Sequence, residues 1–106
     1  MMGFGNPQKL MRQMQKMQAD MARVQESLGD MTVETTAGGG AVRCVMNCKQ
    51  EVRDLGIEPE LLNPEEVEML QDLLIVAFNE ASRLAQEKAA AEMSKVTGNV
   101  KIPGLL

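Results

Sequence analysis

Apolar residues recur at helical spacing through the first quarter of the chain. Steps of four and three residues alternate through the positions Leu10, Met14, Met17, Met21, Val24 and Leu28. This heptad pattern predicts a helix from about Pro7 to Leu28 that packs along its whole length on another helix. Gly29 and Asp30 then provide a stop signal.

Three short runs rich in Val, Thr and Ile follow, at residues 31–36, 41–48 and 51–58. Apolar and polar residues alternate in them, which predicts three antiparallel strands with one dry face. Gly38, Gly39 and Gly40 predict a flexible hairpin loop between the first two strands, and "NCKQ" predicts a tight hairpin between the second and the third. Leu55 and Ile57 are expected to face inward on the third strand, and Pro59 to end the sheet.

The last apolar pattern predicts a long helix. Asn63 is suited to the N-cap and Pro64 to the first helical position, and no helix breaker occurs before Gly98. The segment "LLIVAF" at residues 73–78 is apolar on all sides, so it must be covered on all sides. One three-stranded sheet cannot do this, which predicts contact with a second copy of the protein. The expected dimer-interface residues are Leu73, Leu74, Ile75, Val76 and Phe78.

The helices are expected to overhang the sheet. Strands of about eight residues span roughly 26 Å, whereas helices of about 22 and 33 residues span about 33 and 50 Å. In a dimer, the start of the first helix and the end of the last would project as arms. The predicted fold is a two-layer α+β subunit of order αβββα, one domain over residues 1–106, with a three-stranded antiparallel sheet flanked by long N- and C-terminal helices.

The net charge of −4 argues against a nucleic-acid partner, but its distribution does not. Residues 1–29 hold four cations and two acids, residues 73–106 hold four cations and three acids, and residues 30–72 hold three cations and ten acids. Both ends of the chain are therefore mildly basic. Lys9, Lys16 and Arg23 share one helix face, with Arg12 near its start. The alternative interpretation is that this is an ordinary solvated face.

The composition leaves little for catalysis or metal binding. There is no histidine, tyrosine or tryptophan, so the usual acid, base and nucleophile partners are nearly absent, and we predict no catalytic residue or metal site. No stretch reads as a membrane span or a secretory signal, so an intracellular protein is expected. Cys44 and Cys48 would lie about 13 Å apart on one strand, too far for a disulfide or a shared zinc ion. Cys44 is expected to be a small apolar residue of the sheet. Cys48 is expected to be an isolated thiol at the turn, whose only special role would be a disulfide bond to another chain.

The ten methionines allow three interpretations. Met11, Met14 and Met17 form an MxxMxxM array of the kind that binds Cu(I) through thioethers. A methionine-rich surface could also hold apolar peptides, as in a chaperone-like adaptor. In the third interpretation Met14, Met17 and Met21 fill the seam between two helices, with Met11 at its border.

Several stretches together resemble the YbaB/EbfC family of bacterial nucleoid-associated proteins: "LMRQMQKMQADMARVQESL", "VETTAGGGAVRCVMNCKQEVRDLGIEPELL", "EMLQDLLIVAFNEASRLAQEKAAAEMSKVTG" and "KIPG". The resemblance covers about residues 2–105. It implies a tweezer-like homodimer in the cytoplasm that associates with the nucleoid and binds double-stranded DNA through its helical arms, with no catalytic residues, cofactor or small-molecule substrate. By region and charge, the DNA contacts carry over to Lys9, Arg12, Lys16, Lys88, Lys95 and Lys101.

The family commonly has glycines in the second hairpin turn, where this chain has Cys48 and Gln50. Asn47 is then the residue best able to adopt a left-handed conformation. Phe4 and Phe78 are the only aromatic residues, so stacking on unpaired bases is poorly supplied and contacts with the duplex backbone are favoured. The predicted function is architectural or regulatory binding of duplex DNA with little sequence readout. The alternative is a protein-interaction or chaperone-like adaptor that uses the methionine-rich helix surfaces.

Overall fold

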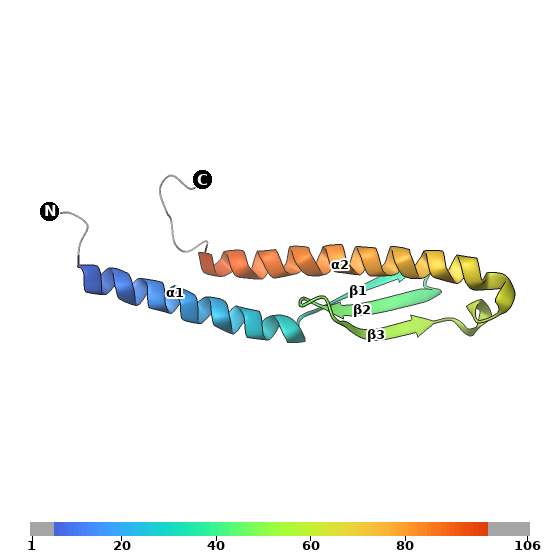
Figure 1. Cartoon of the computed structure of the whole chain (residues 1–106), viewed down its shortest axis with the longest axis horizontal. Helices are drawn as coiled ribbons and strands as arrows, with labels where there is room; N and C mark the ends of the chain where they lie inside the picture. Colours follow the sequence, from blue (N-terminus) through green and yellow to red (C-terminus); the bar gives the residue numbers. More distant parts are fainter. Residues whose placement is uncertain (1–5, 98–106) are drawn as a thin grey trace.

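The computed structural model describes residues 6–97, which form two long helices and one three-stranded sheet (Figure 1). Short 3-10 turns at Leu28–Asp30, Pro59–Leu61 and Pro64–Glu66 connect these elements. In chain order the elements are α1 (Pro7–Ser27), β1 (Thr32–Ala37), β2 (Val42–Asn47), β3 (Val52–Ile57) and α2 (Val67–Thr97). The predicted αβββα order is confirmed, although each strand has six residues rather than about eight.

Both long helices begin at asparagine–proline pairs. The Asn6 side chain accepts a hydrogen bond from the Gln8 N–H at 2.9 Å, and Pro7 opens α1. The Asn63 side chain likewise accepts a bond from the Glu65 N–H at 3.0 Å. These side chains satisfy backbone donors that a helix start would leave without a partner. The predicted start of the last helix is therefore confirmed, with the difference that its first turn is a 3-10 turn.

The sheet has the order β1-β2-β3 and is antiparallel throughout. One face of β2 carries Val42, Cys44 and Met46, all buried. α2 packs on this face with alanines at 77, 81 and 85, which have no side-chain bulk to hold the two layers apart. The Thr35 hydroxyl donates to the Ala77 carbonyl oxygen at 2.8 Å across the interface. The core is thus a strip between α2 and the middle of the sheet.

α2 lies over β1 and β2 and leaves β3 at an open edge (Figure 1). Leu55 pairs with Cys44 and so lies on the helix-facing side of the sheet, but it is 42% exposed. Leu55 therefore faces the helix side of the sheet, as predicted, but no helix within residues 6–97 covers that edge. Ile57 is partly buried against the core, as predicted.

The turn between β2 and β3 differs from the prediction. Gln50, not Asn47, adopts the left-handed conformation, with φ of 63°. Asn47 stays in β2 because its side chain makes four hydrogen bonds there, and the residue is fully buried. It donates to the Gly29 carbonyl and the Glu51 carboxylate, and accepts from the backbone N–H groups of Lys49 and Glu51.

The two cysteines have separate roles in packing. Cys44 is fully buried in the core strip, as predicted, and burial raises the pKa of its thiol. Cys48 was expected to be a thiol available to another chain, but it is only 6% exposed. Its backbone N–H donates hydrogen bonds to the carbonyl oxygens of Leu28 and Met31. These bonds hold Cys48 beneath the junction of α1 and β1. Both thiols are free.

Candidate nucleic-acid interface

The N-terminal part of α1 extends past the end of α2 (Figure 1). Leu28 is buried and Val24, Met21 and Met17 are half-buried, but every residue from Asn6 to Lys16 is exposed. The prediction that α1 packs along its whole length is wrong: the heptad pattern continues beyond the helix that it pairs with, and Leu10 is left 55% exposed. We call residues 6–16 the α1 projection.

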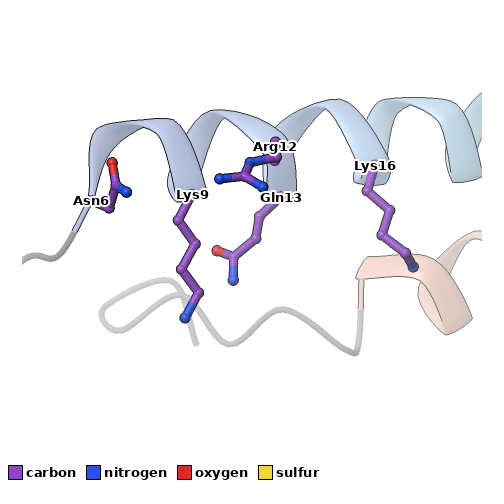
Figure 2. A pocket seen from close by; sticks show the side chains of 5 residues that line it. All are labelled: Asn6, Lys9, Arg12, Gln13 and Lys16. Carbon is purple, nitrogen blue, oxygen red and sulfur yellow. The ribbon is translucent and has the colours of Figure 1, made fainter.

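The three cations of the α1 projection line one groove. Its volume is about 370 Å³, and its walls are formed by Asn6, Lys9, Arg12, Gln13 and Lys16. Figure 2 shows Lys9, Gln13 and Lys16 extending from the same side of the helix. No acidic residue occurs between positions 6 and 16, so this segment carries a local charge of +3 from its three cations.

The surroundings leave two of these cations uncompensated. Lys16 lies 3.3 Å from Asp20, which also pairs with Arg23 at 3.0 Å. Within residues 6–97, no carboxylate lies within ion-pair distance of Lys9 or Arg12. The positive end of the α1 helix dipole adds to their field, since the first turn of α1 holds no acid. This arrangement attracts anions, and phosphate groups in particular.

The cations predicted on the second arm are differently placed. The Lys88 ammonium donates to the Thr32 carbonyl oxygen at 3.2 Å, and Lys95 pairs with Glu92 at 2.9 Å. Lys101 lies outside the described residues. Arg83 pairs with both Glu80 and Glu87, and these partners raise its pKa. The structure therefore gathers Lys9, Arg12 and Lys16 in one groove but does not add Lys88 or Lys95 to it.

The groove includes one residue that the sequence did not single out. Asn6 lines it as the cap of α1, and the pair Asn6–Pro7, a common helix-start signal, could have identified it. Gln13 also lines the groove. It lies one helical turn after Lys9, which places the two side chains together.

The described chain offers no other obvious chemistry. Residues 6–97 contain no group of three or more Cys, Asp or Glu side chains placed to hold a metal ion. In the same range, no helix is long and apolar enough to cross a membrane.

The expected dimer-interface residues fall into two groups. Leu73, Leu74 and Phe78 pack partly against the protein's own core. Ile75 is 57% exposed, and Val76 is exposed to a similar degree. Val52 and Leu55 on the open edge of the sheet are exposed as well.

These features define a small α+β protein with a basic helical projection suited to a polyanionic partner. Residues 2–100 match the model of the YbaB/EbfC DNA-binding family, and the chain belongs to this family. This confirms the resemblance seen in the sequence.

Relatives and a solved structure agree with this assignment. A protein of Desulforamulus reducens is 59% identical and one of Pelotomaculum thermopropionicum is 57% identical, each over 99% of both chains, and both are named nucleoid-associated protein. The crystal structure of the uncharacterized protein HP0035 from Helicobacter pylori has a TM-score of 0.76 at 24% identity, covering 89% of this chain and 99% of that one. The predicted fold class of the subunit is thereby confirmed.

Proposed function

We propose that this protein binds double-stranded DNA through the α1 projections of a homodimer and acts as an architectural, non-catalytic component of the nucleoid in the cytoplasm. The observation that carries the proposal is the α1 projection itself: three helical turns in which every residue is exposed, with three cations and no acid. Membership of a DNA-binding family and the names of the relatives support it. No cofactor, metal or small-molecule substrate is part of the proposal.

Phosphate contacts are expected to dominate the binding energy. α1 contains no aromatic residue, and Phe78 packs against the core, so residues 6–97 offer bases no free ring to stack on. The chain as a whole carries a charge of −4, so general attraction to a polyanion is absent and binding must be local to the projection. Lys88, Lys95 and Lys101 remain candidates on a second arm, with a smaller contribution from the two that already have partners.

The homodimer is proposed from the open corner between α2 and β3. Ser82 of α2 accepts a hydrogen bond from Gln50 in the β2–β3 turn, which shows which side of α2 faces β3. Ile75 precedes Ser82 by two helical turns and lies on that same side. Ile75 therefore faces the same open corner as the exposed Val52 and Leu55, and a second copy related by twofold symmetry could fill the corner with the same residues. We propose that Leu74, Ile75 and Phe78 form the helical part of the interface at this corner, and that Leu73 and Val76, on the other flank of α2, extend it.

Light scattering coupled to size-exclusion chromatography tests the dimer. The wild-type protein should elute with twice the chain mass, and Ile75→Asp should elute as a monomer, because it places a charge in the apolar corner. Leu62→Asp is the matched control, since Leu62 is also exposed but lies outside the corner. A wild-type monomer, or an Ile75→Asp dimer, would contradict the proposed interface.

A duplex-binding titration over a range of salt concentrations tests the DNA function. Six projection cations in a dimer predict a slope of log affinity against log salt of about −5, and Lys9→Ala with Arg12→Ala should reduce it to about −2. The comparison variant, Lys88→Ala with Lys95→Ala, removes as many charges from α2 and should change the slope less. If the wild-type protein fails to bind a short duplex at near-physiological salt, the DNA proposal is refuted. The exposed Leu10, Met11 and Met14 would then favour the adaptor alternative.

A further inference from the structure

The α1 projection has an apolar face in addition to its basic one. Leu10 and Met14 continue the stripe of Met17, Met21 and Val24, but only the last three are half-buried. Met14 is 52% exposed. Single exposed apolar residues are common on protein surfaces, but a continuous stripe on a free projection indicates a contact surface.

The order of side chains around the projection is specific. With about 100° between successive residues, Lys9 and Lys16 lie about a third of the way around the helix from Leu10 and Met14. Gln13 and Asn6 lie between these two faces, and both line the basic groove. A path around the helix therefore passes from cations through amides to apolar side chains.

The size of the projection matches one feature of duplex DNA. All eleven residues from 6 to 16 are exposed, and they form about 16 Å of helix. A helix with its side chains is about 10–12 Å wide, and the major groove of B-DNA is about 12 Å wide. A helix lying across the phosphates would use only its basic face. A helix inside the groove would meet phosphates on its flank and base edges on the neighbouring face.

We propose that the α1 projection enters the major groove, with Lys9 and Lys16 against the phosphates of one wall and Leu10 and Met14 against the base edges. The proposal rests on the DNA-binding function proposed above. The apolar group that base edges offer in the major groove is the C5-methyl group of thymine. The stripe would therefore give this protein a preference for thymine at the contacted positions, in addition to the charge-driven binding that every sequence shares.

Two duplexes of the same sequence, one with thymine and one with uracil in its place, test this directly. They carry the same phosphate charge and differ only in the methyl group. Wild-type protein should bind the thymine duplex more tightly, by about fourfold for each methyl group contacted. The salt slopes for the two duplexes should be equal, because the number of phosphate contacts does not change.

Leu10→Ser with Met14→Ser should abolish the difference between the two duplexes while leaving the salt slope unchanged. Both side chains are exposed, so the thermal unfolding midpoint should stay at the wild-type value. Gln15→Ser is the matched control, because Gln15 is exposed on the same projection but lies on neither face. Lys9→Ala should show the reverse pattern, with a smaller salt slope and an unchanged preference for thymine.

The outcomes separate this inference from the proposed function. Equal wild-type affinity for both duplexes, with strong salt dependence, would overturn groove entry and leave DNA binding in place. A serine variant that weakens binding to both duplexes equally, or that changes the oligomeric state, would also overturn it, since the stripe would then contact something other than thymine. Absence of any duplex binding would remove both proposals.

Discussion

Replacement of Asn47 by aspartate should show how strongly the base of α1 is held to the sheet. The Asn47 amide nitrogen donates to the Gly29 carbonyl at 3.1 Å and to the Glu51 carboxylate at 2.7 Å. Its amide oxygen accepts from Lys49 and Glu51 backbone N–H groups at 3.0 and 2.9 Å. Asn47→Asp has almost the same shape and keeps both accepted bonds. It loses both donated bonds and brings a second carboxylate against Glu51.

The expected destabilisation is large. A buried hydrogen bond contributes about 1 kcal/mol and one to a charged group about 2 kcal/mol, so the two donated bonds account for about 3 kcal/mol. Repulsion between the introduced carboxylate, at a fully buried position, and the exposed Glu51 carboxylate raises the total to about 3–5 kcal/mol at pH 7. Because small domains have about 5–15 kcal/mol of stability, the variant should be close to unfolding.

Urea unfolding followed by circular dichroism at several pH values measures this loss. The folded state should raise the pKa of the introduced carboxyl group, since burial and Glu51 both oppose its charge. The stability lost relative to wild type is therefore smallest below the unfolded-state pKa of about 4 and grows as the pH rises through the folded-state value. Asn47→Ala, the control, should lose a similar amount at every pH. A penalty under about 1 kcal/mol at pH 7, or one that does not change with pH, would refute the reasoning.

Two further predictions concern stability. Gly38→Ala should destabilise the protein by about 1–3 kcal/mol, because Gly38 has φ of 64° and an added Cβ would lie 2.8 Å from a Leu73 methyl group. Gly39 also has a positive φ, but the space around it is open, so thermal melts of Gly39→Ala should show a smaller loss of stability. Hydrogen bonds from Arg43 and Arg83 lower the pKa values of Asp54 and Glu80, so these pairs stabilise the fold above about pH 4.5 and less as the pH falls through the lowered values. The melting temperature should therefore drop in acid, and by less in high salt if these exposed pairs are responsible.

Local features of the fold could be predicted from the sequence, because they depend on neighbouring residues. The Asn63 cap, the alternation that buries Thr35 and the burial of Cys44 follow from spacing of one to four residues. The left-handed residue of the β2–β3 turn was missed because the Asn47 side chain donates a hydrogen bond to the carbonyl oxygen of Gly29, which is 18 positions away. A side chain with such a distant partner is not free to follow its local preference.

The candidate site was also predictable only where it depends on neighbouring residues. Lys9, Arg12 and Lys16 come together because one helix carries them at spacings of three and four residues. Where the seam of α1 stops being covered could not be predicted, since it depends on the offset between two helices that the sheet fixes. The partner of Lys88, the Thr32 carbonyl oxygen, lies 56 positions away. Local spacing therefore identified the cations but not which of them were already engaged.

The short junction between α1 and β1 controls the position of the α1 projection. Between them lie only Leu28–Asp30 and Met31, and hydrogen bonds from Cys48 and Asn47 to the carbonyls of Leu28 and Gly29 fix this short segment to the sheet. α1 is about 30 Å long, so a tilt of about 10° at its base moves its tip by about 5 Å. This exceeds the roughly 3.4 Å of helix axis that separates successive phosphates of one DNA strand. Small changes in backbone angle at this junction would thus decide which phosphate each cation reaches in the proposed complex with DNA.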